Sequence, residues 1–397
     1  MQFHRLQSIE ENIKQGRALI VYGPRRTGKT TLLKEYLKKN AHRKTFLASG
    51  DDIRLRALFS SQIRDDILKF AAPFEIVAID EAQQVPLIGL GVKMIVDEYP
   101  EKEIILTGSS SFDLSQQVGE PLTGRHFTLT LFPFAQSEMD ASEFELKNAL
   151  PDLLIHGSYP EVLKERDAHT KEKILNELVS SYLFKDILAL DKVRSPDSLL
   201  NVVRALAFQI GSEVSLNEIG RLTSLDGKTV GRYLDVMEKM FVIKKVRAYS
   251  RNLRNEISRK AKYYFVDLGV RNALIGQFNP LHLRNDVGQL WENFVFMELV
   301  KQSGIAEDFA TFYFWRTHAG HEVDIVREKS GVLTAIECKW SGSARAPALW
   351  RETYPAARFA VVNRENYTDM LLHEQAKHTE LPDQNKIPPH KAGRNPS

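Results

Sequence analysis

The sequence predicts an α/β protein: an N-terminal parallel sheet covered by helices, then a mainly helical region, then a second, smaller α/β part. Three observations predict the first part. Short apolar runs recur along residues 1–138, helix-forming stretches separate them, and the runs are apolar almost throughout. Alternating strands and helices are typical of a parallel sheet, and continuous apolar runs suit strands buried on both faces. The five predicted strands are residues 18–22, 45–48, 76–79, 104–107 and 127–131.

The composition is that of a globular protein. The 397 residues are 43% hydrophobic and 26% charged, with a net charge of +3 that identifies no acidic partner by itself. The single cysteine, Cys338, excludes an intrachain disulfide and suits a reducing compartment. The sequence shows no signal peptide, and no apolar run reaches the ~20 residues of a membrane span. We therefore expect a cytoplasmic protein without membrane contact.

A phosphate-binding pattern follows the first predicted strand and opens the first predicted helix. The pattern G-x-x-x-x-G-K-[ST] needs this context, because backbone N–H groups and a helix N-terminus face the phosphates. Lys29 would reach the β and γ phosphates of ATP, and the Thr30 hydroxyl would hold Mg²⁺. The alternative is a chance Gly-Lys-Thr in a loop. The predicted nucleotide-binding residues here are Gly23, Pro24, Arg25, Arg26, Thr27, Gly28, Lys29, Thr30 and Thr31.

Two acids end the third predicted strand. Asp80 would bind Mg²⁺ through its coordination shell, and Glu81 would orient and activate the attacking water. Acids at an exposed strand end are common, but here a phosphate loop precedes them by about fifty residues. The two motifs together supply the metal-binding and water-orienting parts of phosphoryl transfer.

Two further positions complete the predicted nucleotide site. A serine-rich run follows the fourth predicted strand, and the C-terminal edge of a parallel sheet lines the ligand crevice. Ser109, or its neighbours Ser110 and Ser111, would sense the γ-phosphate; the alternative is a simple turn. Arg125 precedes the fifth strand and would supply charge to the transition state. It would act within its own subunit or in a neighbour, which would make the protein an oligomer, or it is a surface residue.

The ordered set of motifs resembles the AAA-type ATPases of bacteria and archaea. In that family, a P-loop domain is fused to a C-terminal domain of unknown function. The resemblance implies an ATPase that uses ATP and Mg²⁺, with its P-loop NTPase domain over residues 1–138. Most family members have no assigned biological role, so the resemblance implies little about the biological role of this protein. It rests on residues 23–30, 79–83, 107–110, 122–125 and 131–134, and continues through 157–161 and 182–187.

Two further regions follow the P-loop domain. Residues 139–200 are predicted to form a helical connecting region, because apolar residues recur there at helical spacing. Residues 201–275 are predicted to form a winged helix. The predicted order is a helix, a turn, a second helix and the two strands of a wing, at residues 216–222, 223–227, 229–240, 241–243 and 263–267.

Basic residues gather between the two strands of the predicted wing. Such a cluster is typical of a contact with the phosphate backbone, so DNA is one predicted partner. Winged helices also contact proteins, and a run of charge is often solvated surface, so a protein partner is the alternative. The basic residues are Lys244, Lys245, Arg247, Arg251, Arg254, Arg259, Lys260 and Lys262.

Residues 276–372 hold a second group of charged residues. Glu292 falls in a predicted helix, Asp324 in a strand-like run, and Glu337 with Lys339 in the next run. The side-chain period of two places Glu337 and Lys339 on one face, and Asp324 would join them if the runs pair as a hairpin. Carboxylates and a lysine around Mg²⁺ or Mn²⁺ can activate a water. The alternative is a structural set of salt bridges.

This second pattern resembles the core of restriction-endonuclease-like nucleases, in which an acid is followed by Glu-x-Lys on the next strand. The resemblance implies that Asp324 and Glu337 bind a second metal ion, that Lys339 is the catalytic lysine and that Glu292 is the helical acid. Such patterns also persist in folds that have lost activity. Residues 373–397 are polar and contain several prolines, so we expect a disordered tail.

The sequence thus predicts Mg²⁺-dependent ATP hydrolysis that drives or switches an action on DNA or on a partner protein. One alternative is an ATP-dependent regulatory switch that acts only through protein–protein contacts. Another is an ATP-controlled, metal-dependent DNA nuclease. Binding to DNA that weakens steeply with salt would separate the first two.

Overall fold

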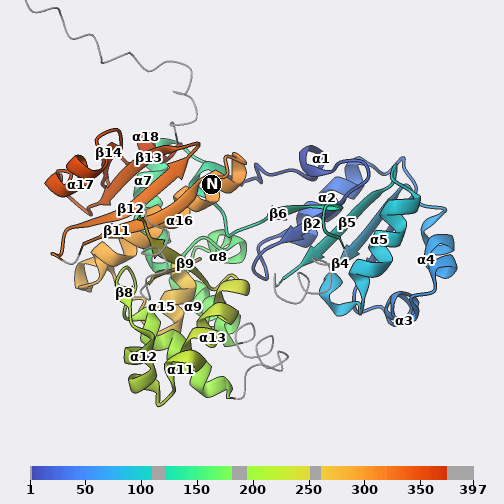
Figure 1. The fold of residues 1–397 in the computed structure, drawn as a ribbon, viewed down its shortest axis with the longest axis horizontal. Helices are drawn as coiled ribbons and strands as arrows, with labels where there is room; N and C mark the ends of the chain where they lie inside the picture. Colours follow the sequence, from blue (N-terminus) through green and yellow to red (C-terminus); the bar gives the residue numbers. More distant parts are fainter. Residues whose placement is uncertain (1, 110–121, 181–194, 251–260, 318, 373–397) are drawn as a thin grey trace, which may run out of the picture.

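Figure 1 shows a computed structural model of the chain, which describes residues 2–109, 122–180, 195–250, 261–317 and 319–372. A five-stranded sheet lies on the right of the view, and a seven-stranded sheet lies on the left. A short antiparallel pair, β1 (Gln2–Phe3) with β7 (Met139–Asp140), ties the start of the chain to the segment that follows the first sheet. None of the described helices is long and apolar enough to cross a membrane.

The five-stranded sheet is parallel throughout and has the strand order β3-β4-β5-β2-β6. The predicted parallel α/β sheet is thereby confirmed. In a parallel sheet the strands end at one common edge, so the loops after β2, β4 and β5 lie together. The strands are β2 (Ala18–Tyr22), β3 (Thr45–Ser49), β4 (Ile76–Asp80), β5 (Glu103–Gly108) and β6 (His126–Thr130).

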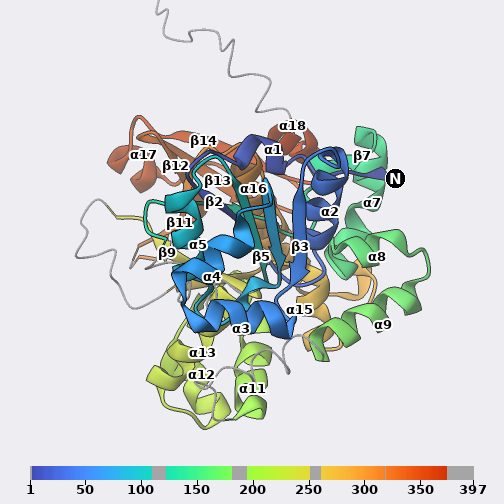
Figure 2. The same cartoon turned by 90° about the vertical axis from the view of Figure 1, so that its right-hand side faces the viewer.

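Helices cover both faces of this sheet (Figure 2). Side chains alternate along a strand, so Leu19 and Val21 of β2 belong to one core and Ile20 to the other. Helices α1 and α2 pack on the first face, and α3, α4 and α5 pack on the second. Their bounds are α1 (Ile9–Asn12), α2 (Lys29–Lys39), α3 (Ile53–Ser61), α4 (Arg64–Ala71) and α5 (Ile88–Glu98).

The seven-stranded sheet is mixed, with the order β14-β13-β12-β11-β9-β10-β8. Strand β9 pairs in parallel with β11, so the sheet continues across the predicted boundary between residues 275 and 276. That boundary stays a prediction. The strands are β8 (Glu213–Val214), β9 (Ile243–Ala248), β10 (Ala261–Phe265), β11 (Thr311–Arg316), β12 (Glu322–Lys329), β13 (Val332–Cys338) and β14 (Arg358–Val362).

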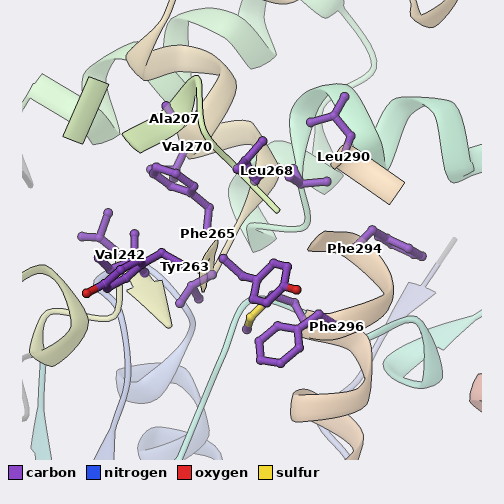
Figure 3. Close-up of a cluster of buried hydrophobic side chains, with 14 of the residues drawn as sticks. Ala207, Val242, Tyr263, Phe265, Leu268, Val270, Leu290, Phe294 and Phe296 are labelled. Atoms are coloured by element: carbon purple, nitrogen blue, oxygen red, sulfur yellow. The ribbon is translucent and has the colours of Figure 1, made fainter. Parts of the chain in front are cut away.

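A large hydrophobic core joins this sheet to its helices. In Figure 3, Tyr263 of β10 lies beside Val242 on the left of the view, and Phe294 and Phe296 lie on the right. The helices of this half are α7 (Glu143–His156), α8 (Pro160–Lys164), α9 (Ala168–Leu178), α11 (Pro196–Ala207), α12 (Leu216–Thr223), α13 (Gly227–Lys239), α15 (Leu268–Leu274), α16 (Val287–Ile305), α17 (Ala348–Thr353) and α18 (Tyr367–Leu372). Short 3-10 turns are η1 (Ala82–Gln84), η2 (Gln136–Glu138) and η4 (Leu281–Leu283).

The region predicted as a winged helix has the element order α11, β8, α12, α13, β9, β10, with β10 paired antiparallel to both β8 and β9. Its assignment as a winged helix stays a prediction. Several predicted positions lie outside the described residues: Ser110, Ser111, the basic residues at 251–260, the motif at 182–187 and the tail at 373–397.

Candidate functional site

The phosphate-binding loop joins β2 to α2 at the carboxyl edge of the five-stranded sheet. Gly28 has φ 96° and caps the N-terminus of α2, a left-handed conformation that glycine adopts without strain. Gly23 has φ 147°, and a Cβ at that position would meet the carbonyl oxygen of Leu131 at 2.1 Å. Both glycines of the pattern are therefore required by the backbone path, which places the loop at the N-terminus of a helix.

The Lys29 side chain is folded onto its own loop. It is 5% exposed, and its Nζ donates hydrogen bonds to the carbonyl oxygens of Gly23 at 2.9 Å and Pro24 at 2.7 Å. A buried ammonium group needs such acceptors. Phosphate oxygens could replace these carbonyls as acceptors with little movement of the side chain, because the amine already lies inside the loop.

Asp80 ends β4 directly beside the loop. Its Oδ2 accepts a hydrogen bond from the Thr30 hydroxyl at 2.7 Å, and its Oδ1 accepts one from Thr107, a buried residue of β5. Hydroxyl and carboxylate oxygens are the hard ligands that Mg²⁺ prefers. Thr30 and Asp80 therefore fit a Mg²⁺ ion that accompanies ATP. Sequence reasoning missed Thr107 as a site residue, although it lies in the quoted motif.

Glu81 follows Asp80 and has φ 52°, a strained conformation of the kind that gathers at functional sites. Its backbone N–H donates to the Thr107 hydroxyl at 3.2 Å. The side-chain amide of Gln83 donates one hydrogen bond to the Glu81 carboxylate and another, at 3.1 Å, to the Ser109 hydroxyl. The structure thus brings Glu81 and Ser109 together, and it adds Gln83, which the sequence did not single out.

Arg125 lies at the opposite edge of the same sheet. It immediately precedes β6, and its carbonyl oxygen accepts a hydrogen bond from the N–H of Ala18, at the start of β2. The phosphate loop follows the other end of β2, so a five-residue strand separates the two. The Arg125 side chain instead pairs with Asp97 of α5. Its predicted role within its own subunit is therefore wrong, because parallel strands carry their two ends to opposite edges.

A short helix from outside the five-stranded sheet faces the loop. A pocket of about 310 Å³ has Gly28, Lys29 and Thr30 on one side and Glu161 with Lys164 of α8 on the other. The Arg26 guanidinium pairs with the Glu161 carboxylate at 3.1 Å across this pocket. In the sequence, residues 157–161 stand out only through the family resemblance, and nothing in their pattern indicates contact with the phosphate loop.

A second, larger pocket of about 870 Å³ adjoins the first. Lys164 and Gly28 line both pockets, and the larger one continues between α2 and the N-terminal segment. The Arg5 guanidinium holds that segment in place, because it donates to the carbonyl oxygen of Thr27 and pairs with Glu138 at 2.8 Å.

The second predicted group, Asp324, Glu337 and Lys339, is also brought together. Strands β12 and β13 are antiparallel, and the pairing of Ile325 with Ile336 sets Asp324 beside Glu337. Lys339 Nζ lies 2.7 Å from Glu337 Oε1. Burial raises the pKa of Asp324, and burial together with Asp324 raises the pKa of Glu337.

Glu292 of α16 lies next to the same group, but its partners are not those predicted. Its Oε1 accepts hydrogen bonds from Lys262 at 3.0 Å and from Tyr264 at 2.6 Å, both on β10. Burial raises the pKa of Glu292 to about 7, although the Lys262 charge acts in the opposite direction. Lys262 is 1% exposed, so its predicted place in a DNA-facing basic surface is wrong.

Family comparisons divide the chain into three segments. Residues 15–140 match the sequence model of an AAA domain. Residues 147–281 match a domain of unknown function (DUF8612), and residues 287–381 match another (DUF4143). These two descriptions assign no activity, so the winged-helix and nuclease-like interpretations stay predictions.

Curated relatives align along most of the chain. An uncharacterized protein of Mycobacterium tuberculosis is 27% identical over 355 residues, which are 87% of this chain and 76% of the relative. One of Haemophilus influenzae is 27% identical over 377 residues, 89% of this chain and 85% of the relative. Both relatives are described as uncharacterized, so their descriptions assign no activity.

Solved structures show a weaker likeness. AMPPCP-bound DnaA of Aquifex aeolicus has a TM-score of 0.27 and 17% identity, covering 57% of this chain and 83% of that one. The RuvB Holliday junction branch migration motor of Thermotoga maritima has a TM-score of 0.26 and 16% identity, covering 58% and 82%. Residues 15–140 thus match an AAA domain, and the phosphate-loop geometry agrees with that match.

Proposed function

We propose that this protein is a Mg²⁺-dependent ATPase that binds ATP between the phosphate loop and α8, and that hydrolysis switches its action on DNA or on a partner protein. One observation carries the proposal. Lys29, the Thr30–Asp80 pair and Glu81 converge at one sheet edge, and a pocket separates them from Glu161 of α8. Nucleotide bound there would touch both halves of the chain.

Each residue has a distinct part in the proposed reaction. Lys29 binds the β and γ phosphates and offsets their charge, and the loop N–H groups orient them. Thr30 and Asp80 hold Mg²⁺, which supplies charge stabilisation to the phosphates. Glu81, positioned by Gln83, orients and deprotonates the attacking water. Ser109 shares the Gln83 amide with Glu81, so it is placed to sense the γ-phosphate through that amide.

Helix α8 would form the opposite wall of the site. Lys164 lines both pockets and offers a second ammonium group to the phosphates, while the larger pocket accommodates the nucleoside. Arg26 pairs with Glu161 at 3.1 Å, and it also belongs to the loop that wraps the phosphates. Phosphates would compete with Glu161 for the Arg26 guanidinium. The position of α8 would then depend on whether nucleotide is bound.

The output on DNA is supported by basic residues of β9. Lys244 and Arg247 are exposed on β9, which begins at the end of the first strand of the predicted wing. Phosphate contacts by such residues would give binding that weakens steeply with salt. The rival function is a switch that acts only through protein contacts, with the same region as an interaction surface.

One experiment tests both the activity and the output. ATP hydrolysis by the full-length protein is measured with Mg²⁺, with EDTA, and with duplex DNA at several salt concentrations. We expect turnover with Mg²⁺, none with EDTA, and DNA affinity that falls linearly with salt on a log–log plot. Replacing Lys244 and Arg247 by Ala should lessen that slope by about two units, one per contact.

The matched control is Lys69→Ala, which removes an exposed charge from α4, far from β9 in the sequence. It should leave the salt slope unchanged. Absence of hydrolysis in a folded protein would overturn the ATPase proposal. Hydrolysis without salt-dependent DNA binding would instead favour the switch that acts through protein contacts.

A further inference from the structure

A buried lysine lies inside the second group of acids. Lys262 Nζ pairs with Glu322 Oε1 at 2.6 Å and with Glu292 Oε1 at 3.0 Å, and the side chain is 1% exposed. Burial by itself would lower the pKa of this amine, but Glu292 and Glu322 more than offset that effect and hold the pKa above its usual value. Lys262 is therefore charged, and its charge balances the acids around it.

One oxygen of each of three acids in this cluster already has a partner. Glu292 Oε1 accepts from both Lys262 and Tyr264, and Asp324 Oδ2 accepts from the backbone N–H of Cys338 at 2.8 Å. Glu337 Oε1 pairs with Lys339 at 2.7 Å. Within the described residues, no three His, Cys, Asp or Glu side chains converge as a metal-binding group. The residues present thus do not fit the metal ion that the nuclease resemblance implies.

We propose that Lys262 is the resident cation of this cluster, in the place of a divalent metal ion, and that the cluster is a clasp rather than a nuclease centre. Two carboxylates that are removed from water need a compensating charge. A nuclease obtains it from metal ions that also activate water, whereas a lysine ammonium supplies the charge without a metal-bound water. Under this proposal, the protein does not carry out the third predicted function, metal-dependent DNA cleavage.

The clasp joins two parts of the chain. Lys262 and Tyr264 lie on β10, within the segment that matches the first domain of unknown function, and Glu292 and Glu322 lie within the segment that matches the second. The packing supports the same junction, because the Tyr264 ring stacks on Phe296 of α16 with centroids 4.1 Å apart. Charge and packing together hold β10 against α16.

Binding of Mn²⁺ tests the proposal. Full-length protein without nucleotide is titrated with Mn²⁺ and followed by the EPR signal of the free ion, in an Asp80→Asn background that removes a ligand of the nucleotide site. We expect no Mn²⁺ site that depends on Asp324. Adding Lys262→Met should create one site, at least about tenfold tighter than any binding to the parent. Adding Asp324→Asn should then abolish it.

Lys245→Met is the matched control, because Lys245 is a half-buried lysine of the neighbouring strand that pairs with Asp235 at 3.8 Å. It should create no site. Two results would overturn the proposal: Mn²⁺ binding by the parent that Asp324→Asn removes, or a folded Lys262→Met chain that binds no more Mn²⁺ than the parent.

A second measurement covers the case in which Lys262→Met folds but is too unstable for the Mn²⁺ titration. The double variant Lys262→Met/Glu292→Gln removes one acid together with its cation, so it should melt at a higher temperature than Lys262→Met alone. A lower melting temperature would contradict the role of Lys262 as the counter-charge of this cluster.

Discussion

The Lys29 amine and the Asp80 carboxylate show how single residues prepare the nucleotide site. Lys29 has two carbonyl acceptors in its own loop, and Asp80 is shared between the Thr30 and Thr107 hydroxyls. Lys29 is buried and Asp80 is partly buried, and each is held by hydrogen bonds where phosphate and Mg²⁺ are expected. The site is therefore preorganised, and removal of one charged group should affect binding or turnover selectively.

Lys29→Ala should lower ATP affinity by at least about tenfold, because charge-assisted hydrogen bonds to phosphate are lost. Isothermal titration with ATP and Mg²⁺ measures the effect. Lys38→Ala, an exposed lysine near the other end of α2, is the control and should bind as wild type does. Equal affinities for Lys29→Ala and the control would show that the loop does not hold the phosphates.

Glu81→Gln should leave ATP binding nearly unchanged and lower the turnover number by at least about 100-fold, because a general base contributes that much or more. Steady-state hydrolysis and ATP titration on the same preparation separate the two effects. Glu101→Gln, an exposed acid before β5, should change neither. Loss of binding together with turnover would assign Glu81 to ligand binding or to structure, since a base acts only in the reaction.

Among the elements, the short helix α8 is the one that faces the phosphate loop from outside the five-stranded sheet. It has only five residues, so its position depends on its neighbours rather than on its own stability. The loop before it is fixed by Ser158, whose carbonyl oxygen accepts the Phe134 N–H at 3.0 Å. Helix α8 is therefore anchored to the end of the ATPase domain while it faces the phosphate loop.

Lys164→Met tests whether α8 completes the site. Loss of its ammonium group should weaken ATP binding by about tenfold, the size expected for one charge-assisted hydrogen bond, and ADP binding by less. Titrations with both nucleotides provide the measurement. Lys173→Met on α9 removes an exposed lysine that lines neither pocket, so it serves as the control. Identical ATP affinities in the two variants would place α8 outside the nucleotide site.

At the scale of the whole molecule, α16 connects the segment that follows the five-stranded sheet to the seven-stranded sheet. Lys301 Nζ donates to the carbonyl oxygen of Phe134 at 3.0 Å and to Ser158 Oγ at 3.1 Å, and it pairs with Glu298 at 2.9 Å. The same helix carries Glu292 into the lysine-containing cluster. A movement of α8 would therefore reach α16 through the loop at Ser158, and from there the seven-stranded sheet.

Arg125 also bears on the assembly of several copies, because it cannot reach the phosphate loop of its own subunit. If Arg125 completes the site of a neighbour, Arg125→Ala and Glu81→Gln should each be inactive alone and regain turnover when mixed. In a mixed oligomer, some sites contain an intact Glu81 from one subunit and an intact Arg125 from its neighbour. Arg64→Ala, which removes another exposed arginine of the ATPase domain, should keep full activity alone. No recovery on mixing would contradict a role of Arg125 between subunits.

The nucleotide site could be predicted from sequence because its parts are local. A phosphate loop is a run of consecutive residues whose chemistry depends on the strand before it and the helix after it. Asp80 and Glu81 follow a buried strand, and parallel strands end at one edge, so their meeting with Lys29 follows from the α/β pattern. The same reasoning placed Asp324 beside Glu337, because a hairpin brings adjacent strands together.

Only the tertiary structure decided the features that join distant parts of the chain. The strand order puts Arg125 at the edge away from the loop, and packing puts α8 opposite the phosphate loop. Packing also buries Lys262, which the sequence predicted as a surface charge, against Glu292 and Glu322. A charged residue carries no local sign of whether it faces water or an acid from another strand. That choice depends on which elements pack together, and residues far apart in the sequence determine it.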